Sequence, residues 1–127
     1  MKKFLASLLI LMSFFTAVHA EVRTYEGVGE YLMTEEIVDF AKHQAALDAE
    51  RNILDKICVH IKAQSTMINN ELDNDEIIAM SAGILHVTDT KFKISEDTGG
   101  FLVKAFVTAE IDFDELQKII DDVIKAR

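Results

Sequence analysis

The sequence predicts an α+β protein, a two-layer domain with a mainly antiparallel sheet packed by a long N-terminal helix, a short helix and a C-terminal helix. Three observations support this fold. Apolar residues recur every four positions from Ala41 to Ile61, which indicates one long amphipathic helix. Residues 101–111 alternate between apolar and polar side chains, as in a strand with one buried face. Residues 116–124 return to helical spacing, which indicates a C-terminal amphipathic helix.

Residues 1–20 have the features of a secretory signal peptide. Two lysines follow the first methionine, an apolar run follows them, and Val18-His19-Ala20 resembles a cleavage site. We expect cleavage before Glu21, which leaves residues 21–127 as a single α+β domain. The apolar run is shorter than the ~20 residues of a membrane-spanning helix, which disfavours a transmembrane anchor. Because Glu21 and not a cysteine follows the cut, no lipid anchor is expected.

The chain is acidic, with 22 aspartates and glutamates against 13 lysines and arginines. The expected cleavage removes two lysines and no acid, so the mature protein is more acidic still. Phosphate backbones and anionic lipid surfaces repel such a protein. We therefore expect no nucleic-acid partner and no transmembrane span after signal cleavage, and the leader indicates a periplasmic or secreted protein.

A first strand is expected over residues 22–31, which contain Gly27 and Gly29 between apolar positions. Thr34 then has the position of a helix N-cap, because its hydroxyl can accept a hydrogen bond from a free backbone N–H. Two glutamates follow it, where negative charge suits the helix dipole. These signals predict that the long helix begins at Thr34.

The long helix carries alanines in its first half, and such a thin ridge lets a sheet or another helix approach closely. The helix is expected to end between Cys58 and Ile61. The β-branched content of residues 59–68 then suggests a strand.

Residues 69–76 are expected to form a polar loop. A short helix follows, capped by Asn74 or Asp75, and it ends near Gly83.

The C-terminal part of the chain is expected to form a β-hairpin and a helix. Residues 86–94 and 100–112 are the two strands, joined through residues 95–100. Asp112 with Glu115 then resembles a capping box that opens the last helix.

Several of these residues are similar to those of a known family. A glycine-bearing strand leads into a helix that reads A-x3-A-x2-D-A-x-R, here Ala41, Ala45, Asp48, Ala49 and Arg51. Ser81-Ala82-Gly83 and the strand Val103-x-Ala105-x-Val107 follow. Over about residues 22–111 the chain resembles the N-terminal domain of the flagellar assembly protein FlgT and related small exported bacterial envelope proteins and lipoproteins. The resemblance implies an α+β module that builds envelope assemblies through protein contacts and has no catalytic residues.

The paired glycines Gly27 and Gly29 could also belong to a nucleotide-binding loop. Such a loop needs a third glycine that opens the helix directly, and Leu32 has that position here. The glutamates that follow would repel a phosphate. The sequence favours a strand whose glycines permit close packing, and no cofactor is expected.

Candidate metal ligands are scattered along the chain. Asp39 and His43 share one helix face, and His60 and His86 would need the fold to bring them together. No zinc-binding spacing is present, and residues 73–76 do not continue as a calcium loop. No metal site is expected.

Nucleophilic catalysis has little support either. Cys58 is the only cysteine and lies among β-branched residues, so we expect a buried thiol rather than a reactive one. Cys58 and His60 are two residues apart, and neither Ser65 nor Ser81 lies in a nucleophile elbow. No catalytic residue is expected, and the protein is not expected to be an enzyme.

Exposed binding faces are therefore the best candidates. Tyr25, Tyr31, Phe92 and Phe106 could lie on the sheet face away from the helices, which a partner, a second copy or the C-terminal helix would then cover. The apolar stripe of residues 116–124 could equally dock a partner.

The sequence thus predicts an exported bacterial envelope protein that acts as a non-catalytic protein-interaction or scaffold module, with another envelope protein or a homo-oligomer as partner. The alternative is a soluble periplasmic small-ligand carrier whose ligand would lie between sheet and helices. A small hydrolase is a third hypothesis, without a supporting triad.

Overall fold

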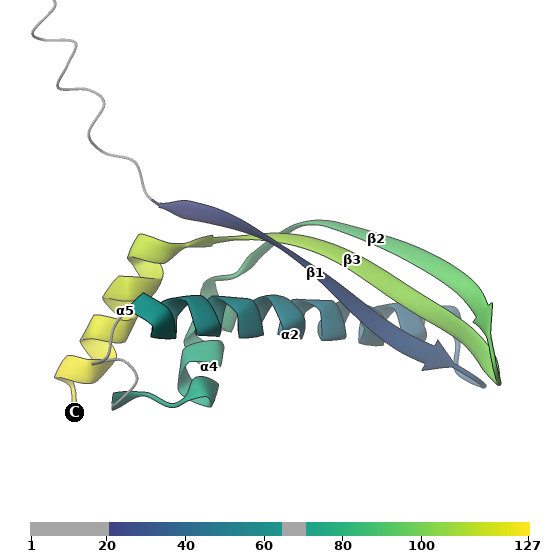
Figure 1. Cartoon of the computed structure of the whole chain (residues 1–127), viewed down its shortest axis with the longest axis horizontal. Coiled ribbons are helices and arrows are strands. Elements are labelled where there is room, and N and C mark those ends of the chain that lie inside the picture. Colours follow the sequence, from purple (N-terminus) through teal and green to yellow (C-terminus); the bar gives the residue numbers. More distant parts are fainter. Residues whose placement is uncertain (1–20, 65–70) are drawn as a thin grey trace, which may run out of the picture.

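The computed structural model describes residues 21–64 and 71–127, in which three antiparallel strands carry three helices on one face (Figure 1). The strand order is β1-β3-β2, so β3 is central and β1 and β2 are the edges. The elements are β1 (Val22–Met33), α2 (Val38–Gln64), α4 (Asn74–Ile84), β2 (His86–Asp97), β3 (Gly100–Asp112) and α5 (Phe113–Lys125). The predicted α+β class, with a long helix packed on an antiparallel sheet, is confirmed.

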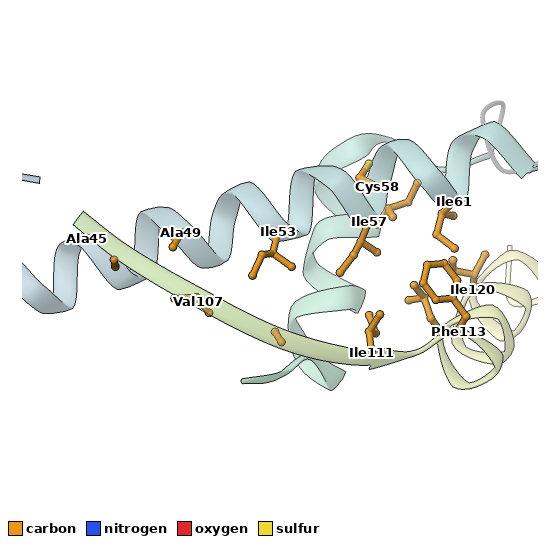
Figure 2. Close-up of a cluster of buried hydrophobic side chains, with 14 of the residues drawn as sticks. Ala45, Ala49, Ile53, Ile57, Cys58, Ile61, Val107, Ile111, Phe113 and Ile120 are labelled. Carbon is orange, nitrogen blue, oxygen red and sulfur yellow. The ribbon is translucent and has the colours of Figure 1, made fainter. Parts of the chain in front are cut away.

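The core lies between α2 and the inner face of β1 and β3. The apolar ridge of α2 is fully buried: Ala41, Ala45, Ala49, Ile53, Ile57 and Ile61. Figure 2 shows α2 and β3 diverging from Ala45 toward Ile57, so small side chains fill the narrow end and large ones the wide end. Each buried isoleucine stabilises the fold by about 1.5–3 kcal/mol, so the wide end supplies most of the apolar stabilisation.

The glycines of β1 lie against the alanines of α2. A Cβ atom at Gly29 would lie 2.1 Å from the carbonyl oxygen of Ala45, and one at Gly27 would lie 2.5 Å from that of Ala49. Real Cβ atoms do not approach backbone atoms so closely, so only glycine lets the helix sit at this height above the strand. The interpretation of these glycines as close-packing residues is confirmed.

The start of α2 differs from the prediction. The helix begins at Val38, and Thr34 is not its N-cap. The carboxylate of Glu36 accepts hydrogen bonds from the backbone N–H groups of Thr34 (2.9 Å) and Glu35 (3.2 Å), so these residues form a bend before the helix. The physical reason for the error is that the Glu36 side chain folds back onto the two N–H groups before it and holds a bend, whereas a threonine cap needs a helical turn that begins directly after Thr34.

The end of α2 also differs. The helix continues to Gln64, so the predicted strand over residues 59–68 is wrong for residues 59–64, and residues 65–68 lie outside the described residues. Ile57 and Ile61 are fully buried on the helical ridge, whereas Val59 between them is 71% exposed. Burial in helical phase therefore outweighs the strand preference of the β-branched residues.

The two later helices have well-formed N-termini. Asp73, not Asn74 or Asp75, caps α4, and it forms a capping box in which its carboxylate accepts from the backbone N–H of Glu76 at 2.8 Å. The predicted N-cap at Asp112 is confirmed, since its carboxylate accepts from the backbone N–H groups of Asp114 and Glu115 at 3.0 and 3.2 Å. The Glu115 side chain does not return a bond to Asp112, so the full capping box predicted there does not form.

The predicted hairpin is confirmed with longer strands. β2 extends to Asp97 and β3 begins at Gly100, so only Thr98 and Gly99 form the turn. Gly99 has a positive φ of 89°, a conformation that glycine adopts without strain.

Replacing Gly29 by alanine tests the contact between β1 and α2. We expect Gly29→Ala to lower the free energy of unfolding by at least about 2 kcal/mol, because the new methyl group meets helix backbone that cannot rotate away. Chemical denaturation monitored by circular dichroism measures the change. The control is Gly83→Ala in α4, where a Cβ meets nothing within 4 Å and should stabilise by up to about 1 kcal/mol. Equal stability of the two variants would contradict the close contact.

Candidate interaction surface

The outer face of the sheet, away from α2, has no helix over it in the described part of the chain (Figure 1). Strand register places Val28 opposite Phe106 and Leu32 opposite Leu102 on this face. Val28, Leu32 and Phe106 are 46%, 43% and 41% exposed. A hollow of about 300 Å³ lies beside Val28 and Phe106. We call Val28, Leu32, Leu102 and Phe106 together the outer apolar patch.

Charged residues border the outer apolar patch. Lys91 lies opposite Phe106, and Lys93 lies opposite Lys104 in the next row. Glu30 completes that row and pairs with Lys104 at 3.5 Å. An apolar centre with a charged rim is typical of a protein-binding surface.

Three of the four aromatic residues predicted for the outer face lie on the inner face instead. Tyr25 stacks on Phe113 with ring centroids 6.3 Å apart, Tyr31 meets Phe40 edge to face at 5.9 Å, and the Lys42 ammonium lies 5.3 Å from the centroid of Phe92. The prediction was wrong because side chains alternate between faces and the register of each strand decides its phase. Only Phe106 is on the outer face.

Sequence reasoning missed Val28 and Leu32. Both alternate with Gly27 and Gly29, and glycines carry no polarity that marks a face. The one available signal was the close-packing role of those glycines, since it assigns Val28, which lies between them, to the opposite face, and Leu32 follows Val28 in the same alternation.

The free edge of β1 is closed by side chains of α2. Asp48 accepts a hydrogen bond from the backbone N–H of Glu30 at 2.9 Å, and Asn52 donates to the carbonyl of Val28 at 2.7 Å. Lys56 donates to the carbonyl of Glu26 at 2.6 Å. The four-residue spacing on the helix matches the two-residue spacing on the strand. This ladder protects an edge that would otherwise pair with another strand.

The free edge of β2 has no such ladder among the described residues. α2 packs over β1 and β3, so the inner face of β2 is left partly open. Phe92 and Ile94 on that face are 39% and 44% exposed. The β2 edge therefore combines free backbone groups with apolar side chains.

The predicted chemical residues are not assembled into a site. Cys58 is buried, its sulfur lies 4.0 Å from the carbonyl oxygen of Asn74, and burial raises the pKa of its thiol, as expected for a packing residue. Ser81 is buried and donates to the carbonyl of Ile77 at 2.7 Å, whereas Ser65 lies outside the described residues.

The three histidines and the aspartate considered as metal ligands form no common site. Asp39 and His43 are exposed on α2, and His86 lies opposite Glu110 at the start of β2. No group of three His, Cys, Asp or Glu side chains within the described residues could hold a metal ion.

A polar and aromatic cluster lies where β1 meets α5. The guanidinium of Arg23 lies 4.3 Å from the ring centroid of Phe113 and contacts the ring of His60 and the carboxylate of Glu21. The ring of His60 packs edge to face on Phe113 at 5.3 Å. Beside it is a hollow of about 460 Å³ lined mainly by α2 residues and Tyr25. These polar groups already have partners within the chain, so the cluster is an anchor of the N-terminal strand.

The sequence matches no family model, and no curated protein matches it. The resemblance to the FlgT N-terminal domain and small envelope proteins rests on the residues quoted for it. No helix in residues 21–64 and 71–127 has the length and apolar character needed to cross a membrane.

The most strongly shifted carboxylate is Glu36, whose pKa is lowered to about 2. Its main cause is the hydrogen bond from the backbone N–H of Thr34, and the hydroxyl of Tyr31 also donates to it at 3.0 Å. A carboxylate with so low a pKa is a poor general base at neutral pH. Its role is to hold the bend before α2.

This assignment predicts a pH dependence of stability. Because the folded-state pKa of Glu36 lies below the ordinary 4.5, its contribution to stability is complete above pH 4.5 and is lost as the pH falls toward 2. We expect Glu36→Gln to flatten this part of the stability curve. Urea denaturation between pH 2 and 6 measures it, with Glu35→Gln as the neighbouring control. A wild-type curve unchanged by Glu36→Gln would contradict the assignment.

Proposed function

We propose that this protein is an exported bacterial envelope protein that acts as a non-catalytic protein-interaction or scaffold module. The observation that carries the proposal is the asymmetry of the sheet. α2 covers the inner face over β1 and β3 and closes the β1 edge, while among the described residues the outer face carries the outer apolar patch and the β2 edge is open. Apolar groups left on a rigid sheet beside charged residues suit a protein partner.

The outer sheet face is a better binding surface than the C-terminal helix. Leu116 and Ile120 of the apolar stripe in α5 are fully buried, and Ile119 and Val123 are half-buried. The stripe thus packs into the protein's own core (Figure 2). A partner could use it only by displacing α5.

The alternative of a small-ligand carrier has less support. The space between sheet and helix is closed at its narrow end, where Gly29 lies against the backbone of Ala45 and Ala49. At its wide end the isoleucines of α2 and the side chains of α5 fill it (Figure 2). The hollows described above lie on the surface, where a small apolar ligand gains little burial.

The export step predicts a specific mature N-terminus. The backbone nitrogen of Glu21 lies 3.1 Å from a carboxylate oxygen of Asp114, and cleavage before Glu21 turns this nitrogen into an ammonium group. The new ion pair would join the start of β1 to the first turn of α5. Because the signal peptide is expected to be cleaved before Glu21, the exported protein should lack residues 1–20. Intact-mass spectrometry measures this.

In that mature protein, Asp114→Asn should lower the free energy of unfolding by about 0.2–1 kcal/mol, and less at high salt because ions screen the pair. Glu115→Gln is the matched control, since Glu115 is also an acid of the first turn of α5 but does not contact Glu21. Equal losses in both variants, with equal salt dependence, would argue against the terminal pair.

Cross-linking in cells tests the interaction role itself. Tagged mature protein, cross-linked in the envelope and identified by mass spectrometry after affinity capture, should recover one defined envelope protein or a fixed homo-oligomer. Phe106→Thr should reduce this recovery severalfold, because it removes the largest side chain of the outer apolar patch while keeping a residue that suits a strand.

Val59→Thr is the control, since Val59 is an exposed apolar residue of α2 outside the patch. Recovery of uncross-linked monomer alone would overturn the proposal. Equal recovery with Phe106→Thr would move the binding surface away from the outer face.

A further inference from the structure

The open edge of β2 points to a particular partner. The proposed interaction role, on which this inference rests, does not say what binds. The two sheet edges differ because α2 supplies a ladder of polar side chains to β1 and none to β2. A long unprotected edge is a template for another strand.

The backbone groups that face the β2 edge follow from the pairing. Glu26, Val28 and Glu30 turn backbone groups toward α2, so the alternate residues of β1, such as Gly29, bond to β3. Gly29 lies opposite Ala105. Ala105 therefore bonds to β1, and its neighbour Lys104 bonds to β2.

The same alternation continues into β2. Lys104 lies opposite Lys93, so Lys93 bonds to β3 and its neighbours Phe92 and Ile94 direct their backbone N–H and C=O groups off the free edge. Phe92 and Ile94 are also the half-exposed apolar residues of the inner face. An added strand would satisfy these backbone groups and cover these side chains together.

The position of the added strand is limited to the hairpin half of β2. A bulge between Val87 and Asp89 breaks regular pairing in the first half. Figure 1 shows α4 and α5 beneath the opposite end of the sheet, so neither of these helices lies against the hairpin half of β2.

The charges along β2 favour a second copy in one register. In an antiparallel pair of identical strands, a two-fold axis at Lys91 or Lys93 would set lysine against its own copy, and an axis at Phe92 would set Lys91 against Lys93. An axis at Ile94 instead places Lys91 opposite Asp97 twice and Lys93 opposite Ser95. An axis at Ser95 also avoids opposed lysines and places Lys93 opposite Asp97, but it pairs a shorter stretch of strand and leaves Phe92 at its end.

The Ile94 register also places the opposite charges where facing strands come closest. Lys91 and Asp97 are then a non-hydrogen-bonded pair, in which side chains of facing strands come closest. Lys91 is 3.8 Å from Asp89 within the chain, but both side chains are largely exposed and that pair is weak. Ile94 meets its own copy on the inner face.

We propose that two copies of this protein join through antiparallel β2 strands, with a two-fold axis at Ile94, to form a six-stranded sheet. Both α2 helices then lie on the same face, and the apolar Phe92 and Ile94 are buried between them. The two outer apolar patches lie on the opposite face, separated by the polar outer side chains of the two β2 strands. The contact is isologous and closes on itself, so it makes a dimer and not a fibre.

A charge swap tests this dimer on the mature exported protein by sedimentation. Lys91→Asp and Asp97→Lys should each raise the dimer dissociation constant by about tenfold or more, because each sets two pairs of like charges face to face. The double variant K91D/D97K should return close to the wild-type value. A wild-type monomer at every concentration, or a dimer that no variant weakens, would overturn the proposal.

Disulfide trapping tests the register. A mixture of the Lys93→Cys and Ser95→Cys proteins should form a cross-linked heterodimer on mild oxidation, because these positions face each other across the pair. A mixture of Lys93→Cys and Asp97→Cys, which fits the Ser95 register, is the matched control. Preferential trapping of the control pair would overturn the Ile94 register.

The outcomes for the dimer and for the wider function are separable. If the protein is monomeric yet one envelope protein is still captured and lost with Phe106→Thr, the dimer is wrong and the interaction role stands. If neither capture nor dimer is found, both fail. A charge-swappable dimer without any further partner supports the dimer and narrows the interaction role to self-assembly.

Discussion

The contact between the glycines of β1 and the alanines of α2 sets the position of everything else. Gly27 and Gly29 leave no side chain between strand and helix, so α2 lies directly on the sheet at one end. At the other end, isoleucines of α2 hold it away from β3 and make room for α5 (Figure 2). The space between α2 and the sheet therefore widens along the helix, because the residues of its buried ridge change from alanine to isoleucine.

This placement also decides which parts of the sheet remain open. A helix seated over β1 and β3 can reach the edge of β1 with Asp48, Asn52 and Lys56, and it does so at hydrogen-bonding distance. It cannot reach β2 in the same way. The placement of α2 therefore protects the β1 edge and, within the described residues, leaves the β2 edge and the outer face without a helix over them (Figure 1).

The titratable groups fit a structural role. Glu36 has a lowered pKa because it accepts hydrogen bonds in the bend before α2, and Cys58 has a raised pKa because it is buried. Each shift is explained by packing or by backbone hydrogen bonding, and neither residue lies on the outer apolar patch or the β2 edge. The features that suit a partner are surface shape, apolar area and charge pattern.

The sequence by itself determined the fold class, the hairpin, the cap at Asp112 and the packing role of the glycines. These depend on local chemistry: residue spacing, side-chain size and the hydrogen bonds of short polar groups. The prediction from sequence placed the start of α2 at Thr34 rather than Val38, and it ended that helix before Gln64. In the first case the Glu36 carboxylate binds the N–H groups of Thr34 and Glu35 and holds a bend where the first helical turn was expected. In the second, burial of Ile61 keeps the backbone helical beyond Val59.

The residues of the outer sheet face could be predicted only in part from the sequence, for a different reason. The face on which Tyr25, Tyr31 or Phe92 lies depends on strand register, and a shift of one residue reverses it. Likewise, no local pattern in β1 or β2 says which edge a helix will cover. Only the tertiary structure decided these points, because they depend on where α2 sits relative to the sheet, and that position comes from contacts between residues distant in the sequence.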